Sequence, residues 1–212
     1  MIQGQSSRAL LVIKIVIAIC LITWGGWSLY QAYGPKDETE KTMPAPTVAG
    51  EPTKKTDQEK AVYTVPADHP RQLLIPSLSI DANILPMGTK DGAIDAPASA
   101  WDAGWYNKSS LPGSSYGSMV IDGHVNDTLN GPGIFYSISR LSSGDIITIE
   151  KGDLQRLDYR VTSVTQVPVG KVNVADLIQT PAGGLHLITC GGQYSEERKT
   201  YNDRVIVTAV RA

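Results

Sequence analysis

The first part of the chain carries one long apolar run. Nearly every residue from Ala9 to Ile22 is apolar, and the run continues to Tyr30, with tryptophan and tyrosine residues gathered at its far end. A helix needs about 20 apolar residues to span a bilayer, and aromatic side chains favour headgroup depth. The pattern predicts a cytoplasmic tail and single transmembrane helix within residues 1–33, with the membrane contact at 9–30.

A cleaved signal peptide is the alternative, because Arg8 precedes the apolar run as in the charged region of such peptides. The run is longer than a signal peptide needs, however, and bulky aromatic residues stand where small residues would mark a cleavage site. Arg8 and Lys14 come before or early in the span, while the charges after it are mixed. This bias favours a cytoplasmic amino terminus, and we expect a single-pass protein of the cell membrane whose carboxyl-terminal domain is extracellular.

Residues 34–70 have a different composition. They contain six prolines and many Lys, Glu and Thr residues, and they show no apolar periodicity. Such a segment buries too little apolar surface to offset the entropy lost on ordering. We expect a disordered stalk that holds the following domain away from the membrane.

Residues 71–212 show the pattern of a sheet. Short apolar or alternating runs rich in Ile, Val and Thr recur, and Gly, Pro, Asn and Asp residues separate them. Only the segment 171–179 has the pattern of a helical turn or a short helix. Seven or eight strands with few helices predict an all-β domain, either a closed barrel or a sandwich.

Composition excludes several classes of protein. The 212 residues include 19 Lys and Arg against 21 Asp and Glu, a net charge of −2, so no basic field favours nucleic acid as a partner. Two cysteines and three histidines are too few for a disulfide framework or a metal cluster. The acidic residues Asp91, Asp95 and Asp102 lack the spacing of a calcium loop. We therefore expect no metal and no cofactor.

One cysteine stands out as a candidate nucleophile. Cys190 ends the run G-L-H-L-I-T-C and is followed by Gly191 and Gly192, so we expect its thiol at the rim of the sheet, where glycine permits close backbone approach. A buried structural thiol is an equally good interpretation of this residue alone. Cys20, inside the predicted membrane span, is most simply a small apolar residue.

A thiol needs a base or a cation beside it to react as a nucleophile. His124 follows the run S-M-V-I-D-G and ends a predicted strand, like Cys190. His186 is on the same strand as Cys190 but four residues away, roughly 13 Å, so we interpret it as a wall residue. His69 falls in the predicted stalk and is expected to take no part.

Two charged residues complete the candidate set. Arg204 opens the last apolar run, R-V-I-V-T-A-V, and is charged at any working pH; an exposed charge at a strand edge is its simpler interpretation. Asp122, two residues before His124, would favour the imidazolium form if the two share a strand face. A solvated aspartate at a strand end is the alternative.

Taken together, these residues resemble the sortase family. The resemblance covers essentially all of residues 71–212 and rests on R-Q-L-L-I-P-S-L-S-I-D-A, D-G-H-V, L-I-T-C-G-G and R-V-I-V. The predicted anchor and stalk match the family's usual layout. The L-I-T-C-G-G form, the G-P-G-I-F-Y segment after the histidine and the short loops look most like class F.

The resemblance implies a closed eight-stranded β-barrel with one or two short helices. It also implies a cysteine transpeptidase at the outer face of a Gram-positive envelope, which cleaves an LPXTG-type sorting motif between Thr and Gly. Cys190 would be the nucleophile that forms a thioester, and His124 the general acid and base. Arg204 would orient the substrate and stabilise the oxyanion, with the Gly191 amide as second donor, and Thr189 would help hold the substrate beside the thiol.

The implied partners are substrate proteins that carry the motif and an amine acceptor, either a cell-wall precursor or a pilin lysine. Two alternatives remain at this point. One is a thiol peptidase, of the hydrolase class, that hydrolyses the same motif. The other is a non-catalytic peptide-binding or adhesion barrel, against which the presence of His124, Cys190 and Arg204 together argues.

Overall fold

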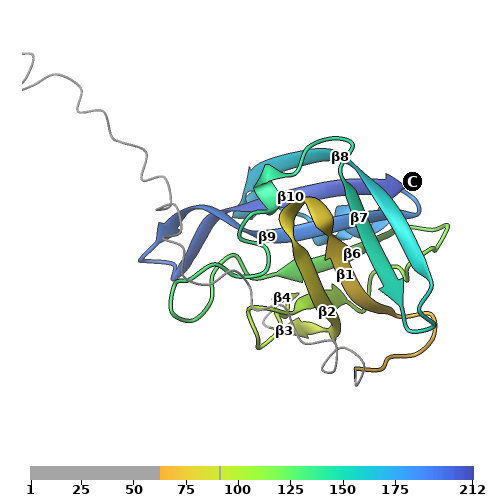
Figure 1. Ribbon diagram of the computed structural model, residues 1–212. Coiled ribbons are helices and arrows are strands. Elements are labelled where there is room, and N and C mark those ends of the chain that lie inside the picture. The colour runs from red at the N-terminus through yellow and green to blue at the C-terminus, as the bar shows by residue number, and fades with distance from the viewer. Residues whose placement is uncertain (1–62, 91) are drawn as a thin grey trace, which may run out of the picture. The chain divides into compact units, whose positions relative to one another are not determined.

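A computed structural model describes residues 63–90 and 92–212 of the chain (Figure 1). The strands in this part of the chain are β1 (Pro70–Ile75), β2 (Ile80–Met87), β3 (Thr89–Lys90), β4 (Ala93–Ile94), β5 (Ala103–Tyr106), β6 (Ser118–Gly123), β7 (Ile146–Lys151), β8 (Arg156–Pro168), β9 (Gly184–Ser195) and β10 (Thr200–Arg211). The helical segments are three 3-10 turns, η1 (Pro76–Leu78), η2 (Ile138–Arg140) and η3 (Val169–Lys171), and the α-helix α3 (Val174–Gln179).

Eight of these strands close into a barrel in the order β1-β2-β5-β6-β9-β10-β8-β7. Neighbouring strands are antiparallel except for the pairs β2–β5 and β6–β9, which are parallel. The antiparallel pairing of β1 with β7 closes the circle, and β3 pairs with β4 in a separate two-stranded sheet. The predicted eight-stranded barrel is confirmed for the described residues, and so is the short helix expected within 171–179.

The predicted transmembrane helix and most of the predicted stalk lie outside the described residues. Within the described part of the chain, no helix is long and apolar enough to cross a bilayer.

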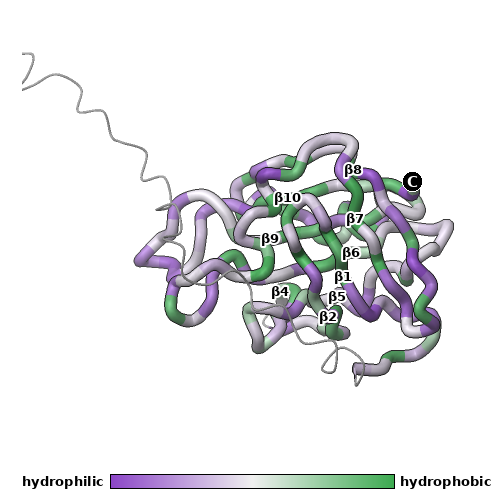
Figure 2. Tube along the Cα trace, in the orientation of Figure 1, coloured by the Kyte–Doolittle hydropathy of each residue, from purple (hydrophilic) through white to green (hydrophobic). Residues whose placement is uncertain are grey.

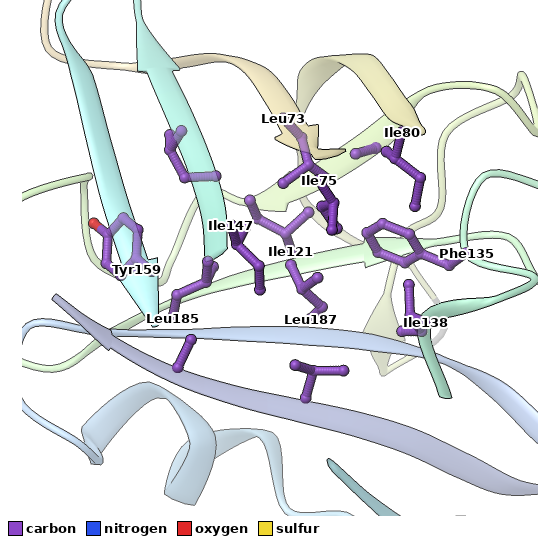
Figure 3. Close-up of a cluster of buried hydrophobic side chains, with 14 of the residues drawn as sticks. Leu73, Ile75, Ile80, Ile121, Phe135, Ile138, Ile147, Tyr159, Leu185 and Leu187 are labelled. Atoms are coloured by element: carbon purple, nitrogen blue, oxygen red, sulfur yellow. The ribbon is translucent and has the colours of Figure 1, made fainter. Parts of the chain in front are cut away.

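Side-chain alternation along the strands fills the barrel. Leu185 and Leu187 of β9 and Ile147 and Ile149 of β7 are fully buried in one apolar cluster, because residues two apart on a strand face the same side of the sheet. Figure 3 shows side chains from β6, β7 and β9 converging inside the barrel, with Phe135 at one end. Burial of each such side chain stabilises the fold by about 1.5–3 kcal/mol.

A second, smaller apolar cluster covers part of the outer face. Its buried members, Val120, Ile188 and Ile206, come from β6, β9 and β10. Leu177 and Ile178 of α3 pack against them from outside. Hydrophobic residues are therefore concentrated in the barrel strands (Figure 2). Where α3 covers the sheet, they lie on its outer face as well as its inner face. The stretch of β6, β9 and β10 beyond this cluster carries the candidate site.

Residues 63–69, placed in the stalk by the sequence analysis, contact the barrel. The Tyr63 hydroxyl donates to the Ile84 carbonyl at 2.6 Å, and the Gly152 amide donates to the His69 carbonyl at 3.0 Å. The His69 ring packs edge-on against the Trp105 ring, with 5.2 Å between the centroids. A Cβ at Gly152 would lie 2.2 Å from the Pro66 carbonyl oxygen, so glycine is needed for this close approach.

Arg71 anchors the segment to the barrel. Its Nε donates to the Tyr63 carbonyl at 3.0 Å, and its Nη1 pairs with Glu150, whose side chain is only 7% exposed. Glu150 also pairs with Arg156 on β8, at 3.0 Å, but the Arg156 side chain is 62% exposed.

We expect Arg71→Ala to destabilise the protein by about 3 kcal/mol, because it leaves a buried carboxylate with one exposed partner. Arg156→Ala removes only an exposed pairing partner and should cost less than about 1 kcal/mol. Urea unfolding of both variants measures the difference in free energy of unfolding. Equal losses in the two variants would contradict this account.

Candidate active site

Three adjacent strands bring the predicted catalytic residues to one region of the barrel. Cys190 of β9 and Arg204 of β10 are direct Cα partners in the antiparallel pairing. His124 immediately follows β6, which pairs in parallel with β9 on the other side. Because parallel neighbours end at the same edge of a sheet, residues far apart in the sequence meet at this rim.

The side chains at this rim face outward from the barrel. Ile188 and Ile206 belong to the outer apolar cluster, whereas Leu187 and Val205 belong to the interior. Alternation therefore places Cys190, two residues beyond Ile188, on the outer face. Arg204, two residues before Ile206, shares that face by the same argument.

Cys190 is half-buried, and its surroundings act on the thiol in opposite directions. Burial raises the pKa of the Cys190 thiol above its usual value, because it disfavours the thiolate. The positive charge of Arg204 lowers that pKa, the carboxylate of Asp122 raises it, and a hydrogen bond with the Thr200 side chain lowers it. The thiolate at this position therefore depends on its cationic neighbour.

Arg204 is held by backbone carbonyls at the base of the β9–β10 hairpin. Its Nη1 donates to the Asp203 carbonyl at 2.8 Å and to the Tyr201 carbonyl at 3.2 Å. Both contacts use the same nitrogen atom, and a guanidinium group has five N–H donors. The side chain is thus fixed beside Cys190 with donors remaining for a negatively charged oxygen.

The backbone around His124 is tightly packed. The imidazole Nε2 lies 2.7 Å from the Pro97 carbonyl oxygen, which fixes the ring. The His124 carbonyl accepts a hydrogen bond from the Phe135 amide at 2.9 Å. A Cβ at Gly133 would lie 2.5 Å from the His124 carbonyl oxygen. The G-P-G-I-F-Y segment thus needs its second glycine in order to pack against the histidine's backbone.

Thr189 and Gly191 flank the cysteine but have different surroundings. Thr189 is buried, and its hydroxyl donates to the Gly123 carbonyl at 2.7 Å. This bond joins β9 to β6 one residue before both Cys190 and His124, so it aligns the two strand ends. Gly191 pairs with Asp203, and a Cβ there would lie 2.8 Å from a Val205 methyl carbon. Substrate contact by either residue stays a prediction.

Asp122 is enclosed, and the interpretation of it as a solvated aspartate is wrong. Its Oδ1 is buried, and no group among residues 63–90 and 92–212 forms a hydrogen bond with it. Burial raises the pKa of the Asp122 carboxyl to about 7, and the negative charge of Asp95 contributes to the increase. The carboxyl is therefore close to half-protonated at neutral pH. A polar residue near the end of a strand gave no sign of this burial in the sequence.

A hydrogen bond that the sequence does not indicate joins two segments at the rim. The Tyr201 hydroxyl donates to Asn126 Oδ1 at 2.5 Å, and the Tyr201 ring packs edge-on against Tyr194, 5.4 Å between centroids. This contact ties the loop after His124 to the β9–β10 hairpin. The pairing register shifts between Tyr201 and Asp203, so strand alternation from Arg204 does not predict where Tyr201 points.

His186 lies away from this rim, as expected for a wall residue. It is buried, and its Nε2 lies 2.6 Å from the Thr180 carbonyl oxygen. Its Nδ1 lies 3.2 Å from the Thr208 hydroxyl. Burial lowers the pKa of the His186 imidazole, so it remains neutral at physiological pH.

Solved structures share this fold. Sortase A from Corynebacterium diphtheriae, as a lid mutant, is 22% identical, with 66% of this chain and 68% of that chain covered and a TM-score of 0.53. Sortase E1 from Streptomyces coelicolor is 21% identical, with 71% and 91% covered and a TM-score of 0.53. SortaseC1 from Streptococcus suis is 19% identical, with 69% and 74% covered and a TM-score of 0.52. Their names span three sortase classes, and at these identities the likeness concerns the fold alone.

Sequence comparison supplies the family. None of the curated proteins compared with the chain matches it. A family model described as the Sortase domain matches residues 73–212, which include every barrel strand from β2 to β10 and the second half of β1. The chain therefore belongs to the sortase family of cysteine transpeptidases.

Proposed function

We propose that the protein is a membrane-anchored sortase that cleaves an LPXTG-like sorting motif between Thr and Gly and transfers the acyl group to an amine of the cell envelope. Cys190 acts as the nucleophile, His124 as the general acid and base, and Arg204 as the group that stabilises the oxyanion. The observation that carries this proposal is the direct pairing of Cys190 with Arg204 on the outer face, with His124 at the end of the strand on the other side.

Acylation uses these three residues in turn. His124 takes the proton of the Cys190 thiol. The resulting thiolate attacks the threonine carbonyl carbon, and the new C–S bond gives a tetrahedral intermediate with a negatively charged oxygen. The Arg204 guanidinium and the Gly191 amide donate hydrogen bonds to that oxygen. The C–N bond to glycine then breaks as His124 protonates the leaving amine, which leaves a thioester on Cys190.

Transfer reverses these steps with a new amine. His124 removes a proton from the incoming amine, the amine nitrogen attacks the thioester carbonyl, and the C–S bond breaks. The Cys190 sulfur leaves as the thiolate and regains a proton from His124, and the product is an amide between the two proteins. An amine is a better nucleophile than water toward a thioester, which favours transpeptidation over hydrolysis.

The proposed location and class rest on the sequence. The apolar run at 9–30 would anchor the protein in the cell membrane, with the amino terminus cytoplasmic and the barrel outside. The L-I-T-C-G-G and G-P-G-I-F-Y segments favour class F among the sortases. The acceptor amine would belong to a cell-wall precursor or to a pilin lysine.

Mass spectrometry of the full-length protein with an L-P-x-T-G peptide tests the proposal. We expect a mass increase on Cys190 that corresponds to the peptide up to its threonine, with release of the glycine-containing fragment. Addition of a glycine or lysine amine should convert this adduct into a ligated peptide.

Two other outcomes favour the alternatives. An adduct that is lost only by hydrolysis, at every amine concentration, would favour a thiol peptidase. Peptide binding without any adduct would contradict the catalytic proposal for this motif and favour a binding module.

A further inference from the structure

A gap in the side chains of β5 accommodates the Asp122 carboxyl group. Gly104 on β5 is the direct Cα partner of Asp122 on β6. A Cβ placed on Gly104 would lie 2.4 Å from Asp122 Oδ1 and 2.7 Å from Met87 Cγ. Because Gly104 has no side chain, the carboxyl group lies over bare backbone, enclosed on one side by Met87.

Pro97 borders the same gap. A Cβ on Gly104 would also lie 3.0 Å from Pro97 Cδ, and the Pro97 carbonyl oxygen is the atom that His124 Nε2 contacts. The Nε2 atom of the His124 imidazole is thus occupied by its contact with a backbone carbonyl oxygen. The charged group that acts on Asp122 is Asp95, from the segment between β4 and β5. The positively charged group that acts on the neighbouring Cys190 is Arg204, from β10.

Asp122 and Cys190 share the outer face of two parallel strands. Asp122 is two residues beyond Val120, a member of the outer apolar cluster, and its Cα partner on β9 is Ile188. Cys190 is two residues beyond Ile188 on that same face. The carboxyl and thiol groups are therefore diagonal neighbours on adjacent strands, and the charge of Asp122 acts on the thiol.

We propose that Asp122 is a positioning residue for the proposed reaction and that it acts on Cys190: the carboxyl group held over Gly104 governs how readily the thiol forms a thiolate. The inference rests on the proposed role of Cys190 as the nucleophile. It goes further in assigning a role to a carboxyl group that the three-residue mechanism does not use.

The direction of the effect follows from the charges. When Asp122 is protonated, the positive charge of Arg204 acts on Cys190 without opposition from the Asp122 carboxylate, and it favours the thiolate. When Asp122 is ionised, its negative charge opposes the thiolate and raises the pKa of Cys190. A negative charge on Asp122 therefore disfavours the thiolate of Cys190.

The rate of Cys190 alkylation by iodoacetamide tests this, because it follows the thiolate fraction and needs no peptide substrate. We would measure it on the full-length protein from pH 5.5 to 9.5, with the Cys190 peptide quantified by mass spectrometry. Asp122→Asn should match the wild type at pH 5.5, where the wild-type carboxyl is protonated. At pH 8 it should react about fivefold faster, because the opposing charge is gone.

Two further variants separate charge from structure. Asp122→Ala also removes the charge and should change the pH profile in the same direction. Asp176→Asn, an exposed aspartate on α3, should leave the profile unchanged. If Asp122 had only a structural role, its replacement would change the alkylation rate by the same factor at every pH. That result would overturn the inference, and so would identical pH profiles for Asp122→Asn and the wild type.

The result is distinguishable from a failure of the proposed function. If L-P-x-T-G peptides form the thioester but Asp122→Asn leaves the alkylation profile unchanged, the inference alone is overturned. If no thioester forms but the profile changes as expected, the coupling of Asp122 to the thiol is supported and the transpeptidation proposal for that motif is overturned.

Discussion

Cys190→Ala is expected to abolish both the peptide adduct and the ligated product. Without the sulfur no thioester forms, and the described part of the chain holds no second free cysteine. The side chain is small and half-buried at the rim, so its truncation should cost no more than about 1 kcal/mol of stability. Intact mass, ligation yield and thermal melting of the variant measure these effects.

Cys20→Ala provides the matched control for that experiment. Cys20, the other cysteine of the chain, lies in the predicted membrane span, and its replacement should leave the ligation rate within twofold of the wild type. Peptide affinity, measured by fluorescence anisotropy, should survive in Cys190→Ala. An adduct that persists in Cys190→Ala would place the nucleophile elsewhere.

Arg204→Ala is expected to lower kcat/KM for ligation by about 10²–10³-fold, the usual cost of removing one oxyanion donor. A second effect has the same cause, since the guanidinium lowers the pKa of Cys190. Its removal should raise that pKa further, so that alkylation at pH 7.5 slows and its pH profile moves to higher pH.

Two further variants test whether the loss of ligation depends on the guanidinium group at position 204. Arg204→Lys keeps the positive charge but loses the planar set of donors, so it should restore the alkylation rate more fully than the ligation rate. Arg198→Ala removes an exposed arginine that contacts Asn202 in the same hairpin and should leave both rates within twofold. Equal losses in Arg198→Ala and Arg204→Ala would show that net charge, not position, is responsible.

The fold was predictable because it depends on a pattern of period two. Runs such as D-I-I-T-I-E show alternation directly, and β7 buries Ile147 and Ile149 as that alternation requires. Cys190, His124 and Arg204 could be named as candidates because each stands at one end of an apolar run. Their adjacency was not accessible from the residues alone, because it depends on which strands pair, and only the family resemblance supplied it.

The features that the sequence analysis missed depend on contacts across strands. The enclosure of Asp122 requires that the residue opposite it be Gly104, and nothing local to either residue reveals the pairing. The packing of residues 63–69 depends on Gly152, which is distant in sequence. The membrane anchor and the assignment to class F remain predictions.

The parallel pairing of β6 with β9 has a consequence for when the enzyme becomes active. Cys190, the proposed nucleophile, and Arg204 come from the last two strands, and β6, which leads to His124, precedes these strands by more than 60 residues. Cys190 and Arg204 pair within one hairpin, but a chain that folds as it is synthesised does not bring them beside β6 until the β9–β10 hairpin enters the barrel. Such long-range pairing forms slowly compared with local structure. The proposed nucleophile therefore lies beside Asp122 and the end of the His124 strand only once β9 has joined β6, and chains that have not reached this stage lack the complete set of proposed catalytic residues.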